Sequence, residues 1–148
     1  MAGFRNPLTI ASLVLAVVGL ALSAYLTYVH YNLDALVCSG GGCELVQTSE
    51  HSEMFGIPIA IFGLLMFIGL IAGIVIRELR PETSDLLSTG ILMVLLTAVL
   101  YWAYLTYLEL NVIHAVWQWC VSTSIATALM LVVEGVRWYR NYQKIGAE

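Results

Sequence analysis

The chain has 148 residues, of which 60% are apolar and only 11% are charged, and its formal net charge is -4. Its mean hydropathy of +0.87 is more than a soluble domain of this length could bury in one core. This composition excludes a soluble globular protein and a basic nucleic-acid-binding surface. It indicates a single integral membrane domain over residues 1–148.

Four apolar runs are each long enough to cross a bilayer, which takes ~20 residues in a helix. They cover residues 8–31, 58–76, 86–110 and 115–136. The runs are too long and too uniformly apolar for barrel strands, and a helix satisfies every backbone group within the lipid. The sequence therefore predicts an all-α bundle of four transmembrane helices, with a polar loop over residues 32–57 between the first two.

The basic residues flank only one end of the predicted bundle. They precede the first run or follow the second and fourth runs: Arg5, Arg77, Arg80, Arg137, Arg140 and Lys144. By the positive-inside rule, both termini face the cytoplasm and the polar loop faces outward. We therefore expect a multi-pass protein of the cell membrane, with the loop on its periplasmic or extracellular side.

The polar loop contains the stretch CSGGGC, in which glycines separate Cys38 from Cys43 and allow two thiols to meet. The loop ends in Gly-Ile-Pro, and Pro58 suits the first turn of a helix. The remaining cysteine, Cys120, lies one to two turns inside the outer end of the fourth run. All three thiols are thus expected near the outer face, where disulfides form and persist.

Two interpretations of these cysteines carry equal weight from their spacing alone. The loop pair is either a shuttle that exchanges electrons with Cys120, or a staple that leaves Cys120 as an ordinary buried residue. A zinc site is a third interpretation. Its ligands would be the loop pair, His51, and either His30 or His114, but this spacing matches no usual zinc pattern, so we expect no metal.

Aromatic residues gather near the outer ends of the predicted helices: Tyr25, Tyr28, Tyr31, Tyr101, Trp102, Tyr104, Tyr107, Trp117 and Trp119. The simplest interpretation is an interfacial belt, which is common in membrane proteins. The alternative is that some of them, with Trp117 and Tyr104 as candidates, wall a pocket for the flat ring of a quinone that meets Cys120.

Few ionisable residues lie inside the predicted spans, which argues against an ion channel or a proton-driven transporter. Glu109 and His114 flank the short loop after the third run, and we interpret them as rim residues, with proton transfer as the alternative. Glu134 lies near the other end of the bundle, and we expect it to be solvated or paired with Arg137.

The polar loop and the residues after it resemble a known family. The stretches CSGGGCELVQTS and GIPIAIFGLLMF, residues 38–49 and 56–67, are similar to short bacterial and archaeal members of the vitamin K epoxide reductase family. The shared pattern is a loop cysteine pair, a serine that is here Ser49, and a Gly-Ile-Pro helix start. WQWCVSTS, residues 117–124, resembles the family's active-site stretch, and the resemblance covers nearly the whole chain.

This resemblance implies a membrane thiol–quinone oxidoreductase that supports disulfide formation outside the cytoplasm. A separate thioredoxin-like partner on the outer face, soluble or membrane-anchored, would pass electrons to Cys38 and Cys43. These would pass them to Cys120, and a quinone of the ubiquinone, menaquinone or vitamin K type would accept them. The resemblance also implies that Ser49 forms a hydrogen bond near the quinone.

One position departs from the family pattern. The family has Cys-x-x-Cys in the fourth helix, whereas this chain has Trp117 and Cys120, and a tryptophan cannot exchange disulfides. Three explanations compete: an engineered or trapped form of an active enzyme, a natural variant in which Cys43 pairs directly with Cys120, or a relative that has lost turnover and keeps a binding role. We favour the first because the rest of the motif is intact.

A rival interpretation from another class is a non-catalytic membrane scaffold or small-molecule binder with a disulfide-stapled loop. The two interpretations make different predictions for Cys120. In the enzyme, replacing this residue changes quinone chemistry, whereas in the scaffold it is a silent core residue.

Overall fold

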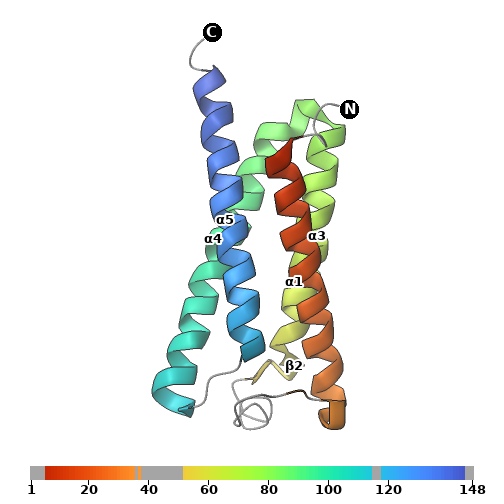
Figure 1. Ribbon diagram of the computed structural model, residues 1–148, viewed down its shortest axis with the longest axis vertical. Helices are drawn as coiled ribbons and strands as arrows, with labels where there is room; N and C mark the ends of the chain where they lie inside the picture. The colour runs from red at the N-terminus through yellow and green to blue at the C-terminus, as the bar shows by residue number, and fades with distance from the viewer. Residues whose placement is uncertain (1–5, 36, 38–51, 115–117, 146–148) are drawn as a thin grey trace.

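The computed structural model describes residues 6–35, 37, 52–114 and 118–145 of the chain. It is a bundle of long helices in which α1 begins and α5 ends at the same end (Figure 1). Four of its helices are long and apolar enough to cross a membrane. The predicted fold class, an all-α bundle of four membrane-spanning helices, is therefore confirmed. The predictions for Cys38, Cys43, Ser49 and Trp117 concern residues outside the described ranges.

The described elements include helices, short 3-10 and π turns, and two short strands. In chain order they are α1 (Pro7–Tyr31), the 3-10 turn η2 (Leu33–Ala35), β1 (Glu53–Met54), β2 (Ile57–Pro58), α3 (Ile59–Leu79), the 3-10 turn η4 (Pro81–Thr83), α4 (Ser84–Leu108), the π-helix η5 (Glu109–Ile113) and α5 (Gln118–Ile145).

The start of α1 follows from a local sequence signal. The side chain of Asn6 accepts a hydrogen bond from the backbone N–H of Leu8 at 3.0 Å. Pro7 occupies the first turn, where its missing N–H would have no partner in the helix. Asn6 and Pro7 together thus fix the point at which the chain becomes helical.

A small hairpin precedes α3. Its strands β1 and β2 pair antiparallel, with Met54 opposite Ile57. Phe55 and Gly56 form the turn at φ values of 56° and 76°. Positive φ at both central residues is the geometry of a type I′ turn, which matches the twist of the strands and favours glycine. The Gly-Ile-Pro stretch thus combines a hairpin turn with a helix start.

The apolar core contains side chains from all four spanning helices. Its buried members are Ala16, Phe67, Leu70, Ile74, Ile91, Leu95 and Met130. The ring of Phe67 lies so close to α1 that a Cβ at Gly19 would be 2.2 Å from it. Only a glycine permits this approach, so Gly19 sets the spacing between α1 and α3.

A cluster of buried charged side chains joins α1, α3 and α5 at the end of the bundle where α1 begins. Arg77 donates hydrogen bonds to both carboxylate oxygens of Glu134, at 2.6 and 3.2 Å. Arg137 forms an ion pair with Glu78 and donates a hydrogen bond to Thr9. The expectation that Glu134 is solvated or paired with Arg137 is therefore wrong, because its partner comes from another helix and it is only 1% exposed.

Candidate functional site

Cys120 lies in the first turn of α5 and is 5% exposed. Its immediate neighbours in a small buried cluster are Leu26 from α1 and Ala98 and Trp102 from α4. Partly buried aromatic and aliphatic residues pack around this cluster: Tyr25, Ala60, Met66, Leu105 and Trp119. The thiol is therefore enclosed by apolar and aromatic surface. We call this region of the bundle, where α1 and α4 end and α5 begins, the Cys120 end.

Two aromatic side chains at the Cys120 end form hydrogen bonds with the backbone of Val37, which directly precedes Cys38. Tyr25 and Trp119 pack with their ring centres 4.8 Å apart. The backbone N–H of Val37 donates to the Tyr25 hydroxyl at 3.0 Å, and the Val37 carbonyl accepts from the Trp119 indole at 2.9 Å. Because Cys38 follows Val37 directly, the chain enters the loop from a point next to the first turn of α5.

The chain after the loop is attached to the same end of the bundle. The ring of His30, in the last turns of α1, lies 3.2 Å from the carboxylate of Glu53 in β1. Among the residues that the structure describes, no three His, Cys, Asp or Glu side chains gather into a possible metal site. The zinc alternative depends on Cys38, Cys43 and His51, which are outside the described ranges, so the expectation that no metal is bound stays a prediction.

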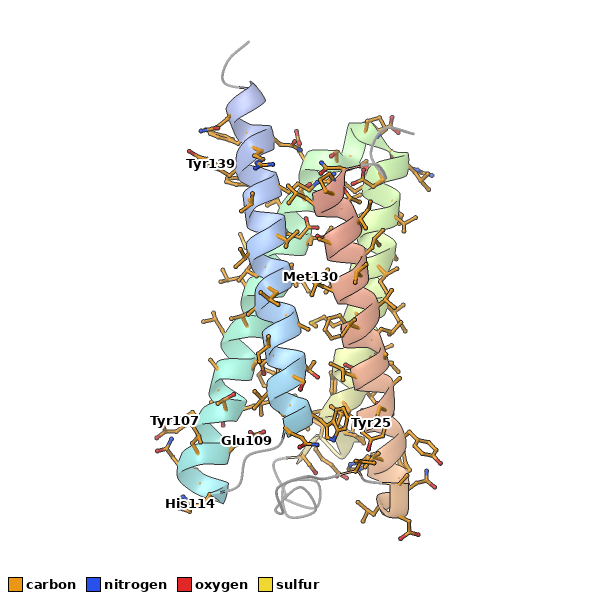
Figure 2. All side chains as sticks on the ribbon, in the orientation of Figure 1. Tyr25, Tyr107, Glu109, His114, Met130 and Tyr139 are labelled. Carbon is orange, nitrogen blue, oxygen red and sulfur yellow. The ribbon has the colours of Figure 1, made fainter. Side chains whose placement is uncertain are left out.

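Glu109 is a site residue that the sequence analysis placed on the rim. The structure instead buries it, to 3% exposure. Figure 2 shows Glu109 at the Cys120 end, where α4 faces the start of α5. An acidic residue at the end of an otherwise uncharged apolar run was the available sequence signal. His114, in contrast, is exposed at the end of η5, as expected of a rim residue.

The aromatic residues divide into two groups by exposure. Tyr104, a candidate for quinone contact, is 55% exposed on α4, and Tyr28, Tyr31 and Tyr107 are similarly exposed, as in an interfacial belt. The rings of Trp102, Tyr25 and Trp119 belong to the cluster around Cys120 or pack against it. Tyr104 instead stands beside the half-buried Tyr101, with ring centres 6.4 Å apart.

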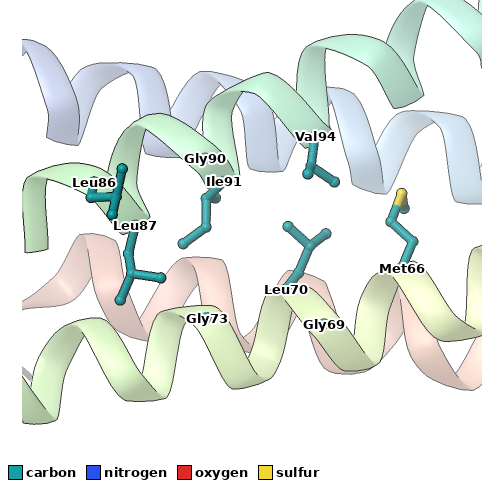
Figure 3. Close-up of a pocket in the computed structure, with 9 residues that line it drawn as sticks. All are labelled: Met66, Gly69, Leu70, Gly73, Leu86, Leu87, Gly90, Ile91 and Val94. Carbon is teal, nitrogen blue, oxygen red and sulfur yellow. The ribbon is translucent and has the colours of Figure 1, made fainter. Parts of the chain in front are cut away.

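A cavity of about 510 Å³ lies between α3 and α4 (Figure 3). Its lining is entirely apolar: Met66, Gly69, Leu70, Gly73, Leu86, Leu87, Gly90, Ile91 and Val94. None of these side chains can transfer protons or electrons, so the chemistry is not here. Only Met66 belongs also to the surroundings of Cys120. The candidate site is therefore the region around the Cys120 thiol and not this cavity.

The sequence matches the model of the Vitamin K epoxide reductase family over residues 10–134. The match begins in α1 and ends at Glu134 of α5, and it includes the loop cysteines and Cys120. It agrees with the bundle of four membrane-spanning helices. The chain therefore belongs to the vitamin K epoxide reductase family and is a multi-pass membrane oxidoreductase.

Proposed function

We propose that this oxidoreductase transfers electrons from thiols to a membrane quinone. A thioredoxin-like partner reduces the loop pair Cys38–Cys43, which passes the electrons to Cys120 and then to a quinone of the ubiquinone, menaquinone or vitamin K type. In the net reaction, two thiols lose two electrons and two protons and join in a disulfide. The quinone gains both and becomes a quinol. The reaction supports disulfide formation outside the cytoplasm.

The proposal rests on one juxtaposition: the buried Cys120 thiol lies beside the point where the chain leads into the loop pair. Trp119, which follows Gln118 at the start of α5, is bonded to the backbone of Val37. Cys120 is the next residue of α5, and Cys38 is the next residue after Val37. This hydrogen bond, together with the covalent neighbours on either side of it, supports the proposal that the two elements of the relay lie at the same end of the bundle.

The surroundings of Cys120 suit a flat, lipid-soluble substrate. Leu26, Ala98 and Trp102 present apolar surface to the thiol, and a quinone ring is apolar apart from its two oxygens. We propose that Ser49, Trp117 and Tyr104 contribute contacts to the quinone. The bound quinone supplies the electron acceptor, and the protein supplies the thiol, the apolar walls and the exclusion of water.

The proposed orientation places the Cys120 end on the outer side of the cell membrane. The six basic residues support this orientation, because in the sequence they all flank the ends of the predicted helices that are opposite to the Cys120 end. A partner that oxidises other proteins outside the cytoplasm could then reach the loop pair directly, in a compartment where disulfides persist.

Trp117 occupies the position at which the relay would otherwise have a second helix cysteine. We propose that the chain as it stands is a blocked form of the enzyme. The shortened relay, in which Cys43 exchanges directly with Cys120, is the alternative within the same chemistry. A non-catalytic binder with a stapled loop is the alternative outside it.

Quinone reduction by the purified full chain in detergent tests these alternatives, with a reduced thioredoxin-like protein or a small dithiol as the electron donor. We expect turnover from Trp117→Cys and not from the parent chain. Adding Cys120→Ala should abolish this turnover, because the quinone-side thiol is lost. Ser122→Ala, which removes a hydroxyl from the exposed face of the same helix, is the matched control.

Other outcomes separate the alternatives. Turnover by the parent chain that is lost in Cys120→Ala would identify the shortened relay. If neither the parent nor Trp117→Cys reduces a quinone, the enzymatic proposal is wrong and the binder is favoured.

A further inference from the structure

The apolar cavity between α3 and α4 is open to the outside of the bundle at its glycines. Gly69 and Gly90 are exposed, and a Cβ built on either would meet no other side chain or helix within 4 Å. Leu70 and Ile91, in contrast, are buried and form the floor of the cavity. The cavity of about 510 Å³ is therefore a groove on a lipid-facing surface, and we call it the α3–α4 groove (Figure 3).

The α3–α4 groove extends from the η4 turn toward the middle of the bundle. Leu86 and Leu87 line it in the first turn of α4, which follows η4 directly. Met66 and Val94 line its other end. From Leu86 to Val94, α4 rises by about 12 Å. One leaflet of a bilayer contains about 15 Å of hydrocarbon, half of the full core. The groove thus has the length of one lipid chain that enters from the η4 end.

The chemistry of the groove requires an apolar occupant. Its lining contains only methionine, leucine, isoleucine, valine and glycine, so a water molecule would find no side-chain partner there. An empty groove would lose the dispersion contacts of its lining. A lipid chain in the groove contacts two helices, whereas a chain on a smooth helical face contacts protein on one side only. The groove therefore favours a chain that is held in place over the surrounding lipid.

Charged side chains lie at the end of the groove where η4 connects the two helices. Arg80, Glu82 and Asp85 are all exposed there. Arg77 and Arg137 are paired inside the bundle, whereas Arg80 forms no ion pair with another described residue. A guanidinium group binds phosphate well, and a carboxylate pairs with an ammonium group. Because two anions accompany one cation, this end of the groove suits a zwitterionic headgroup better than an anionic one.

We propose that the α3–α4 groove is a binding site for a zwitterionic phospholipid of the phosphatidylethanolamine type. One acyl chain lies against Leu70 and Ile91. The phosphate contacts Arg80, and the ammonium group contacts Glu82 or Asp85. The proposal is independent of the proposed thiol–quinone activity, because the groove contains no redox group and lies away from the thiol.

Two other occupants are also apolar, namely the tail of a quinone and a helix from a second copy of the chain. A second copy would use Gly69 and Gly73, whose G-x-x-x-G spacing allows helices to approach closely. A quinone tail would extend from a ring at the Cys120 end. Neither occupant brings a phosphate and an ammonium group to the η4 turn, so the charges there favour the phospholipid.

Native mass spectrometry of the purified full chain in detergent tests this site. The probes are phosphatidylethanolamine and phosphatidylglycerol with identical acyl chains. We expect one phosphatidylethanolamine to bind about tenfold more tightly than phosphatidylglycerol, a difference of about 1.4 kcal/mol. Gly90→Leu should weaken this binding about tenfold, because the leucine takes the place of part of the acyl chain. Gly135→Leu is the matched control on α5, at another position where a Cβ meets nothing within 4 Å, and it should bind as the parent does.

Substitutions at the η4 turn test the headgroup separately from the chain. Arg80→Gln should weaken phosphatidylethanolamine binding about fivefold, the effect of one basic residue near a phosphate-bearing surface. Glu82→Gln combined with Asp85→Asn should shift the preference toward phosphatidylglycerol, because the positive charge of Arg80 is then the one that remains. The thermal unfolding temperature of each variant is measured without lipid, so that a loss of fold is recognised.

Three results would overturn the proposal. If the two lipids bind equally and Gly90→Leu binds as the parent does, ordinary boundary lipid covers the groove. If long-chain ubiquinone displaces phosphatidylethanolamine mole for mole and also binds more weakly to Gly90→Leu, the groove holds a quinone tail. If the parent is a dimer that Gly90→Leu converts to a monomer, a second copy occupies the groove. Should Gly90→Leu fail to fold, Gly69→Leu fills the groove from α3 and gives the same readout.

Discussion

Gly19 and Phe67 illustrate what a single residue determines in this bundle. Phe67 is fully buried in the core, and its ring occupies the space that a side chain at position 19 would need. The close contact between α1 and α3 thus depends on the absence of one methyl group. In a membrane bundle, where lipid competes well for apolar side chains, close packing of this kind is a main source of helix association.

We predict that Gly19→Ala destabilises the bundle by about 1–3 kcal/mol, the usual cost of overpacking a core. The added Cβ would lie 2.2 Å from the Phe67 ring, so the ring or the helix must move. Thermal unfolding in detergent, followed by circular dichroism, measures the change. Gly69→Ala is the matched control, because a Cβ there meets nothing within 4 Å.

A second substitution distinguishes the contact from a general effect of alanine. Phe67→Leu in the Gly19→Ala chain should recover part of the lost stability, since the smaller side chain leaves room for the methyl group. Equal unfolding temperatures for Gly19→Ala and Gly69→Ala would contradict this account of the helix contact.

At the scale of elements, the ion pairs determine how α3 and α5 are held together. Arg77 and Glu134 are almost completely buried, and two hydrogen bonds join them across the interface. The second pair, Arg137 with Glu78, lies in the same cluster and keeps it neutral. Such groups are costly to place within a bundle and are retained only when they are paired.

We predict that Arg77→Met destabilises the bundle by about 3–5 kcal/mol, because the buried carboxylate of Glu134 loses its partner. The double variant Arg77→Met/Glu134→Leu should recover most of this loss, since it removes both charges and fills the space with apolar atoms. Arg80→Met, at an exposed position one turn from the ion pair, is the control. Thermal unfolding in detergent of the parent chain, Arg77→Met, Glu134→Leu and the double variant gives the coupling free energy, and additive effects of the two single substitutions would contradict it.

The helices could be predicted from the sequence because each depends on an uninterrupted apolar run and on local signals such as Asn6–Pro7 at the start of α1. The pairing of Glu134 could not be. Its neighbour three residues along the helix is Arg137, which made a local pair plausible, whereas its partner Arg77 is 57 residues away in the chain. Nothing in the spacing of one helix reports which charged residue faces it from another.

Only part of the candidate site could be predicted, because local motifs can be read from the sequence and contacts between helices cannot. Cys120 could be singled out because thiols are rare and the neighbouring stretch resembles a known motif. Glu109 is expected on the rim because it borders the short loop, yet its spacing from Trp102 and Leu105 continues the buried face of α4. The simplest interpretation places Tyr25 in the same interfacial belt as Tyr28 and Tyr31, yet it is half-buried and packs on Trp119, whereas the other two are exposed.

For the whole molecule, the two ends of the bundle differ in chemistry. One end holds the buried ion pairs, and the other holds the thiol, the aromatic rings and the hairpin before α3 (Figure 1). The bundle is therefore asymmetric along its long axis, which is the axis expected to cross the membrane. The proposed direction, with the Cys120 end outside, makes the loop pair accessible to an extracytoplasmic partner.

We predict that Phe55→Cys is labelled by a membrane-impermeant maleimide in intact cells, whereas Leu79→Cys is labelled only after lysis. Both positions are exposed, at 96% and 66%; Phe55 lies in the hairpin turn before α3, and Leu79 is the last residue of α3. Each substitution is made in a chain whose native cysteines are replaced by serine, so that a single thiol reports. Labelling in the reverse order would show that the bundle is inserted the other way.

The attachment of Val37 to Tyr25 and Trp119 also affects the kinetics of the molecule. Together with the contact between His30 and Glu53, it tethers the chain on both sides of residues 38–51 to the end of the bundle that contains Cys120. In the proposed relay, a loop thiol and Cys120 would therefore meet at an effective concentration set by the tether, and not by the amount of protein in the membrane. We accordingly predict that exchange between them is a first-order process, with the same rate for a dilute and a crowded population of the protein.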